Sequence, residues 1–235
     1  MIDRTKTLTD QDVLEINRGE RGIGIAKTLF TEHKLLPTPV DSRTLEVGFG
    51  QGELIRYLLE TGNRPYGIDV GKASIEGAIE ENFIDKCNLI WMDASINRFP
   101  YIEDFFDYVF MLETIEHLSS PIHVLFEIKR VLKANGKLVI SFPPYEMAGY
   151  EGGKHAHVYP GLLAQESFNR MMMQMYFKKM LFKQIGGTTV YVFENIKEVI
   201  SKASSVRPEE TEGQINVFKV VAGNYTEDEL YGHLR

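Results

Sequence analysis

The chain has little of what marks several other protein classes. It has one cysteine, Cys87, so no disulfide can form within it. No apolar run approaches the length of a membrane span, and the N-terminus, Met-Ile-Asp-Arg, lacks the apolar core of a signal peptide. Positive charge is also scarce, because 26 Lys and Arg face 33 Asp and Glu, a net charge of −7. We therefore expect a cytoplasmic protein without a membrane partner, and nucleic acid is a disfavoured partner for an acidic chain.

What the chain does contain is a glycine-rich segment at residues 45–52, Leu-Glu-Val-Gly-Phe-Gly-Gln-Gly. It predicts a buried strand that ends in a turn and runs into an amphipathic helix. Glycines at alternate positions let the backbone pass close to a ligand, because no Cβ intervenes. Residues 66–69, Tyr-Gly-Ile-Asp, predict a second strand that ends in an acid, and a carboxylate there can accept both hydroxyls of a ribose. These segments predict a pocket for a nucleoside-containing cofactor.

The sixth position of the glycine pattern indicates which cofactor fits. A dinucleotide-binding turn needs glycine or alanine there, where helix and strand pack closely. This chain has Glu53 at that position, and its carboxylate would repel a pyrophosphate. An NAD-dependent reductase is therefore disfavoured. The pattern Gly-x-Gly-x-Gly, preceded by the acid Glu46 and a hydrophobic residue, resembles the first motif of the class I S-adenosylmethionine (SAM)-dependent methyltransferases.

The resemblance to these methyltransferases covers roughly residues 43–142. Asp69 lies where the family places its ribose-binding acid, and residues 92–94, Met-Asp-Ala, lie where it holds the adenine amino group. Residues 106–111 and 130–138 are similar to its fourth strand and to the turn into its fifth. The resemblance, which includes the type 11 and ubiquinone-biosynthesis methyltransferases, implies SAM as the cofactor. The residues implied to bind it are Glu46, Gly48, Phe49, Gly50, Gly52, Asp69, Val70, Asp93, Ala94 and Leu112.

Strand and helix patterns alternate through this region, which predicts a parallel sheet with right-handed crossovers. Strands are expected at residues 44–48, 65–69, 87–92, 106–111 and 137–142, and helices at 52–61, 73–84 and 120–134. The expected fold is α/β, a Rossmann-like, doubly wound, seven-stranded and mostly parallel sheet with an antiparallel C-terminal strand. We divide the chain into a helical N-terminal cap at 1–40, with a bend between two helices, and a SAM-binding methyltransferase domain at 41–235.

The alternation stops after residue 142. Residues 143–163 are rich in glycine and proline and leave the edge of the sheet where ligands bind, so we expect a lid loop there. A methionine-rich helix is expected at 164–180, and its methionines either fill a gap in the core or form a hydrophobic substrate surface. Strands near 184–192 and 214–222 should close the sheet. Residues 193–213 between them would form an insert that includes a helix at 194–203.

The candidate catalytic residues follow the fourth predicted strand, in the sequence Glu113-Thr-Ile-Glu116-His117. On a helical turn Glu113, Glu116 and His117 would share one face. Three interpretations remain open. The segment is a common one after this strand in the family, and the histidine faces the acceptor or packs. Alternatively His117 is the general base, since imidazole titrates near neutral pH. Finally, the three residues with His155 or His157 hold a metal, as in the similar small-RNA 2′-O-methyltransferases.

Our interpretation of the sequence is a SAM-dependent methyltransferase without a resident metal that acts on a small molecule, at a hydroxyl oxygen. The first alternative is a metal-dependent 2′-O-methyltransferase that acts on RNA or a nucleotide. An alternative of another class is a non-catalytic partner subunit with the SAM-binding fold. The intact glycine pattern, together with Asp69 and Asp93, argues against a non-catalytic role. The sequence leaves the acceptor and the oligomeric state open.

Overall fold

The computed structural model describes residues 22–32, 34, 39–72, 74, 76, 88–143, 165–185 and 188–197. The strands in this part are β1 Arg43–Val47, β2 Arg64–Asp69, β3 Asn88–Trp91, β4 Phe106–Leu112, β5 Leu132–Phe142, β6 Phe177–Ile185 and β7 Thr188–Asn195. The helices are α2 Glu53–Glu60, α4 Pro121–Val131, α5 Gln165–Gln174 and the single 3₁₀ turn η3 Ile115–His117. Helical residues 22–27 continue into the π-helical η1 Thr28–Glu32. Among the described residues no helix is long and apolar enough to span a membrane.

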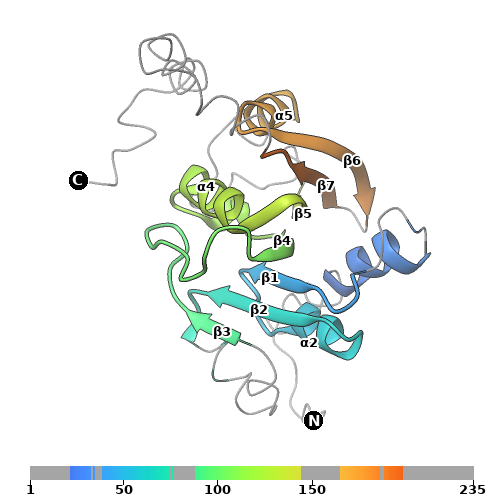
Figure 1. The fold of residues 1–235 in the computed structure, drawn as a ribbon, viewed down its shortest axis with the longest axis vertical. Helices are drawn as coiled ribbons and strands as arrows, with labels where there is room; N and C mark the ends of the chain where they lie inside the picture. Colours follow the sequence, from blue (N-terminus) through green and yellow to red (C-terminus); the bar gives the residue numbers. More distant parts are fainter. Residues whose placement is uncertain are drawn as a thin grey trace.

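The described strands form one seven-stranded sheet in the order β3-β2-β1-β4-β5-β7-β6 (Figure 1). Strands β1 to β5 pair in parallel, whereas β7 runs antiparallel to both β5 and β6. The predicted α/β fold, with a mostly parallel sheet and an antiparallel C-terminal strand, is confirmed. The strand order reverses between β1 and β4, and open α/β sheets bind ligands at such a switch point, beyond the carboxyl ends of the strands.

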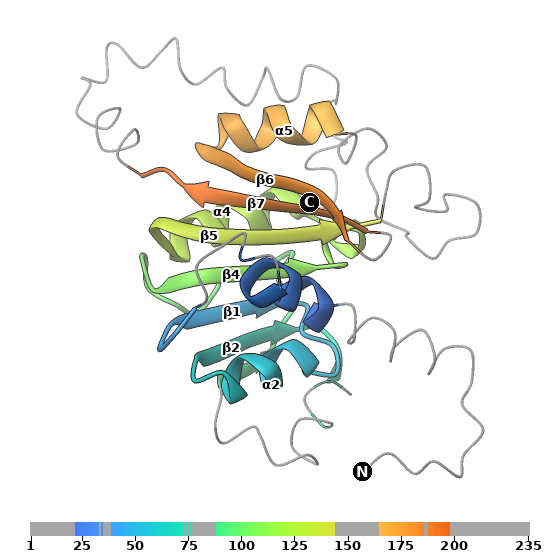
Figure 2. The ribbon, with the colours of Figure 1, turned by 90° about the vertical axis from the view of Figure 1, so that its right-hand side faces the viewer.

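Helices cover both faces of the sheet (Figure 2). Residues 22–32 and α2 pack on one face, where Leu29, Phe30 and Leu54 lie against Phe110 of β4. Helices α4 and α5 pack on the other face. Their apolar side chains join those of β1, β4 and β5 in a second cluster. The central strands β1 and β4 are therefore buried on both sides, which explains the nearly continuous apolar sequence of β4.

The methionines of the predicted long helix divide between core and surface. Met171, Met172 and Met175 are buried in the cluster under α5, whereas Met173 and Met180 are exposed. The buried three fill the core, as the first of the two interpretations expected.

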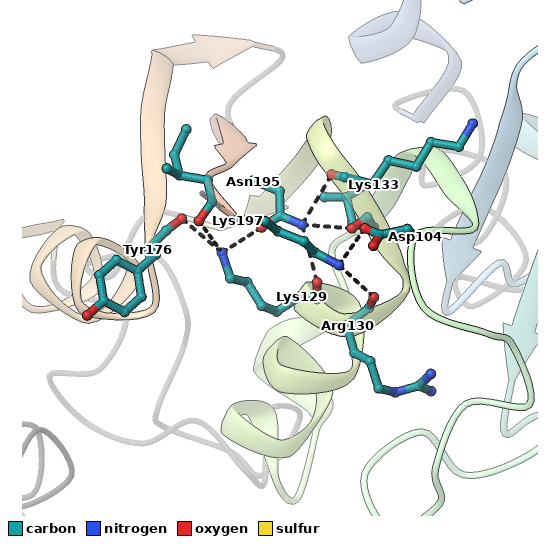
Figure 3. A network of polar contacts seen from close by, with 9 residues as sticks. Asp104, Lys129, Arg130, Lys133, Tyr176, Asn195 and Lys197 are labelled. Carbon is teal, nitrogen blue, oxygen red and sulfur yellow. Dashed lines mark hydrogen bonds and ion pairs between the residues drawn. The ribbon is translucent and has the colours of Figure 1, made fainter. Parts of the chain in front are cut away.

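A polar network joins the end of α4 to the end of β7 (Figure 3). The side-chain amide of Asn195 donates to the carbonyl oxygens of Lys129, Leu132 and Lys133 at 3.2, 2.7 and 3.2 Å. The Lys129 carbonyl is one that the end of α4 leaves without an intrahelical partner, and Leu132 and Lys133 begin β5. The Lys129 ammonium donates back to the Asn195 side-chain oxygen at 2.5 Å and to the Tyr176 carbonyl at 3.0 Å. The network fixes β7 next to β5, on the side of the sheet away from β1.

The C-terminal part of the sheet differs from the prediction. The helix expected at 164–180 ends at Gln174, because Tyr176 takes a left-handed φ of 57° and the chain turns into β6. The strand expected at 184–192 is instead the pair β6 and β7, which form an antiparallel ladder. The expected helix at 194–203 is wrong at its start, since Glu194 and Asn195 belong to β7. The strand expected at 214–222 lies outside the described residues.

The other predicted helix and strand boundaries differ less from those in the structure. Helix α4 ends at Val131, not at residue 134, and β5 begins at Leu132, not at 137. The turn expected between this helix and strand lies inside β5, where Asn135 has a left-handed φ of 61°. The strand is irregular there, because its register against β4 shifts between Phe106 and Tyr108. Of the helix expected at 73–84, only residues 74 and 76 are described, and both are helical. Residues 1–21 and all but the first residue of the 143–163 loop lie outside the described residues, so the lid and the domain division stay predictions.

Candidate active site

The glycine turn follows β1 at the centre of the sheet. Gly48, Gly50 and Gly52 have φ angles of 77°, 53° and 76°, in the left-handed region that glycine adopts without strain. A Cβ on Gly48 would overlap the side chain of Thr114, whereas a Cβ on Gly50 would meet nothing within 4 Å. Glycine is thus required at 48 by packing. At 50 the backbone borders open space, as expected beside a ligand.

Two adjoining cavities lie beyond the carboxyl ends of the strands. The larger has a volume of about 440 Å³ and the smaller about 200 Å³. Both are lined by Gly48, Asp69, Val70, Thr114 and His117. The larger cavity is also lined by Gly22, Ile25, Glu46, Phe49, Gly50, Gln51, Glu53, Leu54, Ser74, Leu112 and Glu113. The smaller is also lined by Val47, Ile68, Met92, Asp93, Ala94, Ser95, Leu118 and Ser119. The structure thus gathers almost all residues that the sequence assigned to cofactor binding.

Asp69 ends β2 at the junction of the two cavities. Its Oδ2 accepts a hydrogen bond from the backbone N–H of Gly50 at 2.8 Å. Its Oδ1 accepts from the N–H of Gly71 at 2.6 Å and from the Ser74 hydroxyl at 3.3 Å. The carboxylate therefore holds the glycine turn in place as well as facing the cavities. A carboxylate has about four acceptor sites, so Asp69 retains capacity for a ligand hydroxyl beside these three bonds.

The smaller cavity is bordered by the turn after β3 and by the residue after β2. Asp93 accepts a hydrogen bond from the N–H of Ser95 at 2.8 Å, and Ala94 is buried beside it. Val70 is 67% exposed, and its carbonyl accepts a hydrogen bond from the indole N–H of Trp91 at 2.8 Å. The sequence had not assigned Trp91 a place near the site. Its ring orders the backbone of a residue that lines both cavities.

Glu46 is the most buried of the acids that line the larger cavity. It is 6% exposed, and its Oε2 accepts no hydrogen bond from the residues that the structure describes. Burial raises the pKa of its carboxyl well above the usual range, and the nearby charges of Glu53 and Asp69 raise it further. The backbone N–H of Ile55 acts in the opposite direction. Burial and the neighbouring acids thus shift the pKa of this carboxyl in the direction of its protonated, neutral form.

Glu113 does not share a helical face with Glu116 and His117, contrary to the expectation. It has a left-handed φ of 49° directly after β4, and only Ile115–His117 are helical. Its Oε1 accepts hydrogen bonds from the hydroxyl of Ser141, at 3.0 Å, and from that of Thr188. Both hydroxyls are buried, at the ends of β5 and β7. Glu113 therefore lines the larger cavity in a fixed position, and no sequence pattern indicated its two partners.

Glu116 and His117 point in different directions. Glu116 is 1% exposed and is absent from the lining of both cavities, whereas the His117 side chain is 36% exposed and lines both. The His117 Nε2 atom lies 4.0 Å from the Glu116 Oε1 atom. Across the residues that the structure describes, no three His, Cys, Asp or Glu side chains converge as metal ligands. His155 and His157 lie outside them. The catalytic roles of the three residues stay predictions.

Comparison with known families identifies the fold. Residues 45–140 match the family model of a methyltransferase domain. This stretch contains most of β1, all of β2 to β4, the glycine turn, Asp69, Asp93 and nearly all of β5. By this match, residues 45–140 are similar to a methyltransferase domain.

Two curated relatives match this chain over a stretch of similar length. A ubiquinone biosynthesis O-methyltransferase from Nitrosococcus oceani is 31% identical over 100 residues, 42% of each chain. A 27-O-demethylrifamycin SV methyltransferase from Amycolatopsis mediterranei is 28% identical over 110 residues, 45% of this chain and 40% of that one. The chain thus spans about two fifths of the length of these curated relatives. The crystal structure of a SAM-dependent methyltransferase from Aquifex aeolicus shares the fold, with a TM-score of 0.59 and 21% identity over 81% of this chain and all of that one.

The cavities of the methyltransferase domain fit a nucleoside that carries a positively charged tail. Four acidic side chains line the larger cavity, from Glu46, Glu53, Asp69 and Glu113, and its described lining includes no Lys or Arg. Such a lining favours a cation and repels a phosphate. SAM, which bears a sulfonium and an ammonium group, matches this charge. Glu53, the residue that disfavoured a dinucleotide, lies in the first turn of α2.

Proposed function

We propose that the chain is an enzyme that binds SAM and transfers the methyl group to a hydroxyl oxygen of a small-molecule acceptor. The observation that carries the proposal is the position of His117. This side chain lies at the junction of the two cavities and is partly exposed, at the end of β4 where the strand order reverses. An imidazole there can accept a proton from a hydroxyl group near neutral pH.

Different residues around the cavities would hold different parts of the cofactor. Asp93, Ala94 and Val70 would hold the adenine, and Asp69 the ribose, since Asp69 lies at the junction. The tail would then enter the larger cavity toward Glu46. When bound, SAM supplies a methyl carbon already activated by its sulfonium sulfur. The chain must therefore orient the acceptor oxygen and remove its proton.

The acceptor-side residues suit these two tasks. His117 would take the hydroxyl proton, and the buried carboxylate of Glu116, 4.0 Å away, would stabilise the imidazolium that forms. Glu113, fixed by the Ser141 and Thr188 hydroxyls, would orient the acceptor from the wall of the larger cavity. The metal-dependent RNA alternative needs Glu113, Glu116 and His117 to converge, and the burial of Glu116 weighs against it.

Product analysis tests this proposal. The purified chain would be incubated with SAM that carries a ¹³C-labelled methyl group and a panel of phenolic, aliphatic hydroxyl and amine acceptors. The carbon chemical shift of the product distinguishes a methyl group on oxygen from one on nitrogen or carbon. We expect O-methyl products, with turnover lost in His117→Asn and SAM binding kept. Products methylated only on nitrogen or carbon would contradict the proposal, and so would the absence of SAM binding.

A further inference from the structure

Glu46 occupies an unusual position for an ionisable group. It lies on β1, the strand at the switch point, between β2 and β4. Its side chain is 6% exposed and still lines the larger cavity, and its Oε2 receives no hydrogen bond from the described residues. A buried polar atom without a partner is costly unless a ligand supplies one. Its location marks where such a ligand group belongs.

The charges around Glu46 are negative. Glu53 of α2 and Asp69 of β2 are the charged groups that act on it, and Glu113, after β4, lines the same cavity. The imidazole of His117 lines the same cavity, and residues 22–27 contribute only the uncharged Gly22 and Ile25. A proton on Glu46 therefore relieves repulsion between neighbouring carboxylates while no cation is bound.

The two cavities indicate which part of a nucleoside ligand approaches Glu46. Asp69 borders both cavities, Asp93 and Ala94 border only the smaller, and Glu46 borders only the larger. A base at Asp93 and a ribose at Asp69 send the 5′ substituent toward Glu46. In SAM and in its product S-adenosylhomocysteine (SAH), that substituent ends in an aliphatic ammonium group with three N–H donors.

We propose that an ammonium-bearing cofactor releases one proton from Glu46 when it binds, so that its affinity increases with pH. The proton passes from the carboxyl to the solvent, and the resulting carboxylate pairs with the ammonium group, which keeps its own protons. The coupling is reciprocal, because a ligand that prefers the ionised carboxyl must also lower its pKa. This inference rests on the proposed function only in assuming that a SAM-type ligand enters the larger cavity.

Calorimetry counts the proton directly. Binding of SAH would be measured at one pH in two buffers of different ionisation enthalpy, since the difference in heat gives the number of protons released. The comparison ligand is 5′-methylthioadenosine, which has the same nucleoside but no ammonium group. We expect up to one proton released with SAH and none with methylthioadenosine. Over the pH range of that release, SAH affinity should rise about tenfold per pH unit.

Two matched substitutions assign the proton to its group. Glu46→Gln should bind SAH with no proton release and with little dependence on pH. Glu53→Gln removes a neighbouring carboxylate and keeps Glu46, so release should persist and shift to lower pH, because one source of repulsion is gone. Should Glu46→Gln not bind SAH, the comparison of SAH with methylthioadenosine on the wild type still decides the question.

The outcomes separate this inference from the proposed function. A wild-type chain that binds neither ligand overturns both. Binding of SAH without proton release overturns the role of Glu46 and leaves the proposed function intact. Equal release with SAH and methylthioadenosine, or undiminished release in Glu46→Gln, would assign the proton to another group and would also overturn the inference.

Discussion

The buried ammonium group of Lys129 makes the stability of the fold depend on pH in a predictable direction. Lys129 lies in α4 and is 7% exposed. Besides its bonds to Asn195 and Tyr176, it lies 4.8 Å from the centroid of the Phe177 ring. Burial, together with the smaller effect of the Lys197 charge, lowers the pKa of this ammonium group from the usual 10.5 to about 8.

The sign follows from the protons bound in each state. Between pH 8 and 10.5 the unfolded chain keeps a proton on Lys129 that the folded chain has lost, so stability increases with pH in this range. The pKa difference between the folded and unfolded states corresponds to a gain of about 3 kcal/mol in the free energy of unfolding over the whole titration. About 2 kcal/mol of this gain appears between pH 7 and 9.5. For a domain of this size, 2 kcal/mol raises the melting temperature by roughly 4–8 °C.

Urea unfolding of the wild type and of Lys129→Met at pH 7 and 9.5 measures this effect. Methionine keeps an apolar side chain over the Phe177 ring and cannot ionise. We expect the free energy of unfolding of the wild type to increase by about 2 kcal/mol more than that of the variant between the two pH values. Burial raises the pKa of Tyr101 and Tyr191, which opposes the gain at high pH, but equally in both proteins. Lys178→Met, at an exposed position in β6, is the control. Equal pH dependence in wild type and Lys129→Met would refute the reasoning.

Three further substitutions test the site. Gly50→Val should abolish SAH binding in calorimetry, because its side chain enters the cavity. Gly62→Val is the control, because Gly62 also has a left-handed φ, 81° against 53° for Gly50, and a side chain there would meet nothing within 4 Å. Gly62 lies at the other end of α2, so this variant should bind SAH normally. Loss of binding in both would point to strain alone. His117→Ala should lower turnover roughly 10²–10⁴-fold with SAH affinity and melting temperature nearly unchanged. A large drop in melting temperature with unchanged turnover would make it a packing residue. Thr188→Val should cost about 1–3 kcal/mol in urea unfolding and lower turnover more than SAH affinity, and wild-type turnover would show that its bond to Glu113 has no role.

The cofactor side of the site was predictable because its signals are local. The glycine turn and Asp69 each depend on a few consecutive residues and on the strand that precedes them. The C-terminal hairpin also had a local signal, the pair Gly186-Gly187, which favours a two-residue turn. We missed it because the methionine-rich sequence before it favours a helix, and only the left-handed Tyr176 ends that helix.

The acceptor side was harder to predict because its contacts depend on register. Glu113 meets Ser141 and Thr188 only because β5 and β7 pair so that Ser141 lies opposite Val190. No pattern within one strand encodes that alignment. The charge state of Glu46 likewise depends on acids from other elements, among them Asp69, which the tertiary fold brings together.

The bond from the Trp91 indole to the Val70 carbonyl also gives the protein an intrinsic optical probe. Trp91 is the only tryptophan in the chain, so indole emission has a single source. That source is bonded to the backbone of a residue that lines both cavities. A ligand that moves Val70 changes the surroundings of the indole, and emission then follows ligand occupancy in real time. Rapid mixing could therefore resolve the rates of cofactor entry and exit without any attached dye.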